Sequence, residues 1–359
     1  MTWDFSRRKY LAGIVTTGVT SCAGCAGLDT NTGDETVAVG INGTVAGGIN
    51  VPMYGHNPAR TGALPDRTGP TDTVSAQWQF DDNEGYVLHP PTVVNNRVYI
   101  GSTDNYLYAL DAVDGTRQWS VEAGDAISGS PAVVDGIVYF GSSDRRLYAI
   151  SADSGDSQWL IQLDQPVLSG PTVTDGTVYV TTGDRGDAGS VYAIDTETRR
   201  SQWEFGVNNG IHSSPAVVDG RVYLGCLDSR VYALDAETGQ KHWSYETDAE
   251  IISSPAVVSD TVYIGSYDGQ MYALNTSDGS VRWTFETDGQ IGATPAVVDN
   301  TVYFGSTDST LYALDAATGT ERWSRELESM ESSPTVLDGV VYVTSGYDLA
   351  ATLGGCWGL

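Results

Sequence analysis

The feature that most constrains the fold is a motif that recurs six times in register. It reads VYALDAETGQKHW at residues 231–243, and close variants end at Trp119, Trp159, Trp203, Trp283 and Trp323. Each copy follows a proline-led segment, and these prolines recur about every 40 residues, at Pro91, Pro131, Pro171, Pro215, Pro255, Pro295 and Pro334. A repeat of this length predicts copies of one small structural unit packed against each other.

The unit that begins at Pro215 contains signals for four short strands. PAVVDGRVYLG holds two β-branched runs separated by Asp219-Gly220, a dipeptide typical of a tight hairpin because glycine readily adopts a positive φ. CLDSR then turns the chain into VYALDA, and a polar loop leads to KHWSYE. Four antiparallel strands per repeat predict a blade of an all-β propeller. Solenoid repeats are usually shorter or helical, and no helical period is present here.

The repeated tryptophan is interpreted as structural. A blade cannot bury both of its faces alone, so its large aromatic side chains must pack between blades. We therefore expect docking roles for Trp78, Trp119, Trp159, Trp203, Trp243, Trp283 and Trp323.

The ends of the repeat array predict how the ring closes. The unit from Pro334 ends before it reaches a tryptophan in register, whereas VSAQWQF supplies Trp78 ahead of the first unit. An N-terminal strand that completes the last blade would remove exposed strand edges. The interpretation is a propeller over residues 78–359, with seven blades and with eight as the alternative. Trp357 is an imperfect competitor for the closing position.

The charge of the chain excludes some partners. The formal net charge is -28, and the only lysines are Lys9 and Lys241. Nucleic acids and anionic membrane surfaces would require the opposite balance. The composition resembles that of proteins from extreme halophiles, where concentrated salt screens repulsion among surface carboxylates.

The N-terminus is typical of an exported protein. Ser6, Arg7, Arg8, Tyr10 and Leu11 resemble a twin-arginine signal, followed by an apolar run too short to span a bilayer. Cys22 or Cys25 is the candidate lipidation site, against the alternatives of simple cleavage or a stray CxxC pair. We expect a signal over residues 1–25, a flexible linker over 26–50 and an extended lead-in over 51–77.

The repeats resemble a known family. ALDAETGQKHW and its copies resemble the tryptophan-docking motif A-x-D-x-x-T-G-x-x-x-W of pyrroloquinoline quinone (PQQ) propeller repeats, with departures at Ser151, Asn275 and Arg199. That superfamily includes quinone-dependent alcohol and sugar dehydrogenases and also non-enzymatic relatives, among them the propeller lipoprotein of the bacterial outer-membrane assembly machine. The segment VPMYGHNPARTG resembles the lead-in of exported proteins with these repeats.

Any ligand or partner surface is expected where the repeats disagree. The residue three positions before each proline varies sharply, and Asp125, Asn209 and Glu250 flank these positions in the loops that enter the inner strands. The alternative is a variable, solvent-facing loop. The candidate positions are Leu88, Ser128, Leu168, His212, Ile252, Gly292 and Glu331.

The sequence favours binding over catalysis. A quinone dehydrogenase would need calcium, a carboxylate base and a cation near the quinone, and no lysine or arginine occupies the variable positions. The insertion TTGDRGDAGS offers only Asp184 and Asp187 as weak calcium ligands. We therefore expect no cofactor and no catalytic residue. The leading hypothesis is a monomeric scaffold, lipid-anchored to the outer face of the cytoplasmic membrane, that binds envelope proteins or a small ligand. A PQQ- and calcium-dependent dehydrogenase is the alternative.

Overall fold

The computed structural model describes residues 37–39, 53–55, 57–64, 78–80, 83–327, 330, 332–337 and 340–343. The expected export signal, the two candidate lipidation cysteines, Glu331 and Trp357 lie outside these residues. Throughout the described part of the chain the regular elements are strands. No helix there is long and apolar enough to cross a membrane.

Six consecutive sheets each contain four antiparallel strands in chain order, from an inner strand of three residues to an outer strand. The first sheet comprises β4 (Thr92–Val94), β5 (Arg97–Gly101), β6 (Tyr106–Asp111) and β7 (Arg117–Glu122). The second comprises β8 (Ala132–Val134), β9 (Ile137–Ser142), β10 (Arg146–Ser151) and β11 (Ser157–Gln162). The third comprises β12 (Thr172–Thr174), β13 (Thr177–Thr181), β14 (Gly189–Asp195) and β15 (Arg200–Val207).

The next three sheets repeat this plan. The fourth comprises β16 (Ala216–Val218), β17 (Arg221–Cys226), β18 (Arg230–Asp235) and β19 (Lys241–Glu246). The fifth comprises β20 (Ala256–Val258), β21 (Thr261–Gly265), β22 (Gln270–Asn275) and β23 (Val281–Glu286). The sixth comprises β24 (Ala296–Val298), β25 (Thr301–Ser306), β26 (Thr310–Asp315) and β27 (Glu321–Glu326).

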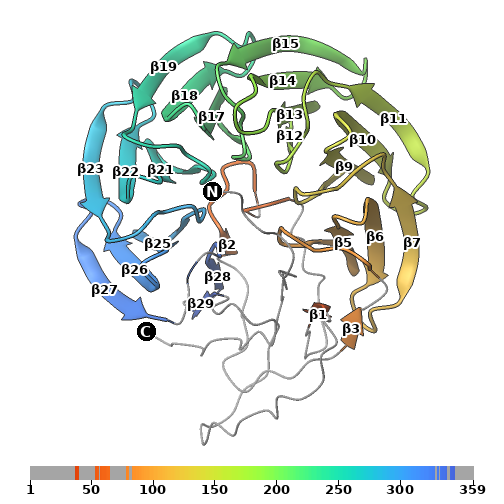
Figure 1. Ribbon diagram of the computed structural model, residues 1–359, viewed down its shortest axis with the longest axis horizontal. Coiled ribbons are helices and arrows are strands. Elements are labelled where there is room, and N and C mark those ends of the chain that lie inside the picture. The colour runs from red at the N-terminus through yellow and green to blue at the C-terminus, as the bar shows by residue number, and fades with distance from the viewer. Residues whose placement is uncertain are drawn as a thin grey trace, which may run out of the picture.

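The sheets stand around a central axis as the blades of a β-propeller (Figure 1). Successive inner strands contact one another in chain order, from β4 and β8 onward to β24 and β28. The outer strands β7, β11, β15, β19, β23 and β27 form the rim in Figure 1. The predicted all-β propeller is confirmed.

The closing region combines strands from both ends of the chain. A seventh, three-stranded sheet contains β28 (Thr335–Leu337), β29 (Val340–Tyr342) and β2 (Ala63–Leu64), with β2 parallel to β28. The strand that contains Trp78, β3 (Trp78–Phe80), pairs with β1 (Val37–Val39). No strand pair joins β3 to β29 in the part of the chain that the structure describes. Trp78 nevertheless packs on the turn of the first blade, just as Trp243 packs on the turn of the blade that follows it. N-terminal strands therefore take part on both sides of the closing region.

The predicted hairpin between the first two strands of a blade has the expected backbone. Asp219 and Gly220 have φ values of 49° and 71°, and Asp135 and Gly136 have values of 51° and 74°. Two consecutive positive φ angles define the turn whose twist matches that of the flanking strands. Asn95 and Asn96 serve the same purpose in the first blade, since asparagine tolerates this region better than most residues.

The recurring tryptophan joins each blade to the next. The Trp243 Nε1 donates a hydrogen bond of 2.9 Å to the Thr276 carbonyl, and its ring lies against Gly279 in the turn of the following blade. Gly279 has a φ of 72°, and a Cβ there would lie 2.6 Å from the indole. The glycine is required both for its backbone conformation and for the close approach of the ring.

The same bond to the next blade recurs at four other tryptophans. Their Nε1 atoms donate to carbonyls at 2.9–3.2 Å, from Trp78 to Ala112, Trp119 to Ala152, Trp203 to Ala236 and Trp283 to Ala316. Tyrosines of the second strands strengthen three of these junctions. The Tyr99, Tyr179 and Tyr263 hydroxyls donate to the same carbonyls as their neighbouring tryptophans. Each junction therefore satisfies buried polar groups while it buries aromatic surface.

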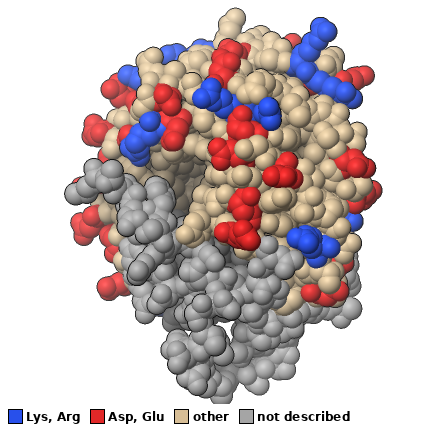
Figure 2. Space-filling view, turned by 45° about the vertical axis from the view of Figure 1, so that its right-hand side comes forward, with Lys and Arg blue, Asp and Glu red and all other residues tan. Residues whose placement is uncertain are grey.

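The surface charge is dispersed. Figure 2 shows Asp and Glu side chains spread over one face of the molecule, with Lys and Arg side chains beside some of them. Arg282 contacts Asp260 at 2.5 Å, and Arg322 contacts Asp315 at 2.8 Å. On that face the carboxylates do not gather into one patch, which fits a role in surface hydration.

Candidate functional site at the channel mouth

The variable positions lie one per blade, in the loops that enter the inner strands. Leu88 is 41% exposed, whereas Ser128, Leu168, His212, Ile252 and Gly292 are half-buried. A Cβ on Gly292 would lie 2.9 Å from Ile252 Cδ1 and 3.2 Å from Tyr267, so these two neighbouring loops touch. The six described positions precede six different inner strands, so they belong to six different blades.

Beneath these positions, a belt of hydrogen bonds links neighbouring blades. From the third blade to the sixth, the residue before the inner-strand proline uses its N–H to reach the hydroxyl of its counterpart in the next blade. The bonds run from Gly170 to Ser214, Ser214 to Ser254, Ser254 to Thr294 and Thr294 to Ser333, at 2.9–3.2 Å. The repeated Ser-Pro and Thr-Pro pairs therefore satisfy the buried backbone at the mouth.

The insertion in the third blade folds against the two blades that follow it. His212 Nε2 lies 3.1 Å from Asp184 Oδ1, and Arg185 pairs with Glu250. The Gly186 N–H donates to Asn209 Oδ1 at 2.8 Å. Burial lowers the pKa of His212, and the Asp184 carboxylate opposes that shift. These contacts fix the insertion as a ridge beside the mouth.

The structure gives the two weak calcium candidates different settings. The Asp184 carboxylate accepts hydrogen bonds from the Arg185 N–H and is next to His212, while the exposed Asp187 donates its own N–H to the Asp184 carbonyl. Among the described residues, no three His, Cys, Asp or Glu side chains are grouped to hold a metal ion.

The channel itself contains the described part of the lead-in segment that ends at Gly62. Residues 58–62 follow the inner edges of the fourth to seventh blades and accept their backbone hydrogen bonds. The N–H donors and carbonyl acceptors pair as Val217 with Pro58, Val257 with Ala59, Val297 with Thr61 and Val336 with Gly62, at 2.8–3.1 Å. We call residues 53–55 and 57–62 the plug.

Arg60 holds the plug on its other side. Its side chain is fully buried, and Nε donates to the Pro215 carbonyl at 2.7 Å. Nη2 donates to Thr172 Oγ1 at 2.5 Å and to the Gly170 carbonyl at 3.2 Å, and Nη1 donates to the carbonyl of Tyr54 at 2.9 Å. Burial lowers the Arg60 pKa to about 9.

Tyr54 ties the plug to the hydroxyl belt. Its hydroxyl donates to Thr294 Oγ1 at 2.8 Å and lies 2.9 Å from Ser333 Oγ. The ring meets His89 edge-on with a centroid distance of 6.1 Å. Burial, Arg60 and His212 lower the pKa of His89 to about 4.

This arrangement does not fit the cofactor that the fold suggests. PQQ chemistry needs calcium ligands and a free cation near the quinone oxygens. The described mouth offers no group of metal ligands, and Arg60 is already bonded to four acceptors inside the channel. Arg185, the other cation near the mouth, is paired with Glu250.

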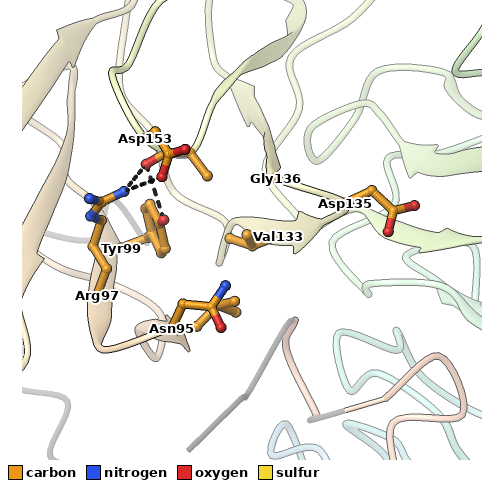
Figure 3. A pocket seen from close by; sticks show the side chains of 9 residues that line it. Asn95, Arg97, Tyr99, Val133, Asp135, Gly136 and Asp153 are labelled. Carbon is orange, nitrogen blue, oxygen red and sulfur yellow. Dashed lines mark hydrogen bonds and ion pairs between the residues drawn. The ribbon is translucent and has the colours of Figure 1, made fainter. Parts of the chain in front are cut away.

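A pocket of about 390 Å³ lies at the opposite end of the strands, between the first two blades (Figure 3). Arg97 lies 3.4 Å from Asp153 across this pocket, and Tyr99 bonds to the Ala152 carbonyl. The Asp135 carboxylate points away from Arg97 (Figure 3). Arg97, Tyr99 and Asp153 of this pocket are therefore engaged in joining the two blades.

Blades joined through a tryptophan and a glycine turn define a β-propeller of the PQQ-like repeat class. A family profile described as outer membrane protein assembly factor BamB matches residues 72–127, 122–206, 187–292 and 283–353. The chain therefore belongs to that family. No protein of curated function matches the sequence significantly.

Solved structures share the fold. BamB from Moraxella catarrhalis is 22% identical, with a TM-score of 0.65 over 76% of this chain and 83% of that one. The quinohemoprotein alcohol dehydrogenase from Comamonas testosteroni is 14% identical, with a TM-score of 0.69 over 83% of this chain and 77% of that one. Enzymes and a non-enzymatic assembly factor are thus similar to this chain at the level of the fold.

The sequence signals located the mouth but not the plug. The repeats identify the variable positions because these stand out against a constant background. Arg60 and Tyr54 precede the repeats and have no counterpart within them. The resemblance of VPMYGHNPARTG to a lead-in segment pointed to this stretch, but nothing in the sequence placed it against the inner edges of the blades.

Proposed function

We propose that the protein is exported, lipid-anchored, and binds another envelope protein through the loops around the channel mouth, without catalysis. The observation that carries this proposal is the plug, which places the chain's own residues along the inner edges of the fourth to seventh blades. Recognition would then use the loops around the channel mouth, where the insertion ridge is fixed by Asp184–His212 and Arg185–Glu250. Membership of a family described as an assembly factor supports an envelope role.

The loops around the channel mouth supply the variation in sequence that a specific partner requires. The half-buried and exposed positions of these loops include the apolar Leu88 and Ile252 and the charged Arg185 and Glu250. An apolar centre with a polar border is the usual composition of a protein interface. The opposite end of the strands lacks this variation because its turns repeat from blade to blade.

Site-specific photo-crosslinking in intact membranes tests the binding surface. A crosslinking residue at Ile252 is expected to trap one defined partner, and Arg185→Glu should abolish the product. The matched control is Val113, which is 55% exposed in a turn at the opposite end. Equal products from both positions, or none from Ile252, would exclude the loops around the mouth as the binding surface.

Two further experiments separate the remaining parts of the proposal. Cys22→Ser and Cys25→Ser variants should show which cysteine is needed for recovery in the membrane fraction, and retention of the double variant would exclude lipid anchoring.

Purified protein supplied with PQQ and calcium should not oxidise alcohols or sugars in a dye-linked assay. Saturable turnover would replace the scaffold with a dehydrogenase.

A further inference from the structure

We propose that the channel is a peptide-binding site that recognises an arginine, with residues 57–62 as its built-in ligand. This inference needs no external partner, and it shares with the proposed function only the observation that the plug lies in the channel. It rests on the plug, on the inner edges of the blades, and on the seat of the Arg60 guanidinium.

The inner edges recognise the peptide through its main chain. Strand edges present unpaired N–H groups, and an extended peptide can satisfy them without regard to its side chains. Here the N–H groups of Val217, Val257, Val297 and Val336 all bond to the plug. In the described residues, the equivalent N–H groups of Val93, Val133 and Val173 have no such partner.

The seat supplies the selectivity for arginine. The Pro215 and Gly170 carbonyls and Thr172 Oγ1 come from the third and fourth blades and accept bonds from Nε and Nη2. Their placement matches the planar fork of a guanidinium, whereas an ammonium has its donors at one point. No carboxylate forms an ion pair with Arg60 among the described residues, so neutral oxygen acceptors and the Tyr54 ring, 5.3 Å from the guanidinium carbon, hold the cation.

The plug is shaped before it is bound. The Arg60 N–H donates to the Asn57 carbonyl at 3.0 Å, and Asn57 Nδ2 donates to Thr61 Oγ1 at 2.7 Å. Gly62 bonds back to the Gly55 carbonyl at 3.1 Å. A ligand held in its bound conformation loses less entropy on binding, which favours its insertion into the channel.

Chemical rescue of the full-length protein tests the seat. Arg60→Ala leaves buried acceptors without donors, and we expect a Tm loss of about 10 °C. Guanidinium chloride at about 10 mM, far below denaturing concentrations, should raise the Tm of this variant by about 3–4 °C. Tetramethylammonium at equal ionic strength cannot donate hydrogen bonds and should not raise it.

Arg97→Ala is the matched control. Arg97 also donates to a carbonyl, but its side chain is 24% exposed, so water can replace it. Guanidinium should not raise the Tm of this variant or of the wild type. Equal shifts in all three proteins, or no shift in Arg60→Ala, would overturn the proposal.

Amide hydrogen exchange of the wild type covers the case in which Arg60→Ala does not fold. The amides of Val217, Val257, Val297 and Val336 should exchange at least about tenfold more slowly than those of Val93, Val133 and Val173. Equal rates in the two groups would show that the plug does not occupy the channel.

Discussion

The two halves of the propeller are held together differently. From the fourth blade onward, the inner edges donate backbone hydrogen bonds to the plug. In the first three blades the described plug residues accept no backbone N–H bond from the inner strands, although Met53 packs in a cluster with Ala132 and Val173 and Arg60 bonds to Thr172. One tryptophan there, Trp159, also faces a turn with Arg199 in place of glycine.

This difference shows that identical-looking repeats need not contribute equally. Trp159 packs on Tyr139 with a centroid distance of 5.7 Å, but its indole makes no hydrogen bond to the next blade within the described residues. Arg199 adopts a φ of 59°, which is unfavourable for a residue with a Cβ. The first three blades, whose inner strands donate no backbone hydrogen bond to the described plug residues, are therefore expected to unfold first.

Removal of a docking tryptophan should have the largest effect. Trp243→Ala deletes a buried ring and its bond to Thr276, so we expect a loss of about 3–5 kcal/mol. Trp159→Ala should lose about 1–2 kcal/mol less, because that bond is not present to be lost. Urea titrations of both variants provide the comparison, and equal losses would contradict a difference between the halves.

A side chain at Gly62 should separate the plug from the ring. Gly62 has a φ of 65°, and a Cβ there would lie 2.8 Å from the Ala296 Cβ. Gly62→Val should cost about 3 kcal/mol through backbone strain and the clash. Gly136→Val is matched to it, with a φ of 74° and no atom within 4 Å of the added Cβ. A cost of about 1 kcal/mol is expected there, and thermal unfolding measures the difference.

The pH dependence should report on His89 beside the plug. Its pKa is lowered to about 4 in the folded protein, so the unfolded chain takes up a proton first as the pH falls. The contribution of His89 to stability is complete above about pH 6.5 and is lost as the pH falls toward about 4. After allowance for partial exposure, His89→Gln should reduce this decrease by about 1–2 kcal/mol.

Arg60 and His212 are the charged or titratable groups that oppose protonation of His89. Urea titrations at several pH values compare His89→Gln with His212→Gln. Overlapping curves for wild type and His89→Gln would show that His89 does not contribute.

Arg199→Gly should give the smallest effect, and it should be stabilising. Glycine relieves the positive φ at that turn, with an expected gain of about 1 kcal/mol and a rise in Tm of about 2–4 °C. The gain should disappear in a Trp159→Ala background if better docking of the ring contributes to it. A lower Tm would mean that the Arg199 side chain stabilises the turn.

The sequence by itself determined the repeating parts of this protein. The hairpin at Asp219-Gly220 and the tryptophan–glycine junctions follow from local turn chemistry and from a pattern repeated in register. Because each junction joins positions with constant spacing, one repeat is sufficient to predict the others. The first-blade contact of Trp78 follows the same rule.

Only the tertiary structure decided the contents of the channel. Arg60 bonds to Pro215 across 155 residues, and Tyr54 bonds to Thr294 across 240. Each of these contacts occurs once. The plug is not part of the repeat, and the inner strand edges that it meets come together only when the ring of blades has formed. A local or periodic signal cannot encode such a contact, because its energy arises from acceptors that the folded blades place around one guanidinium.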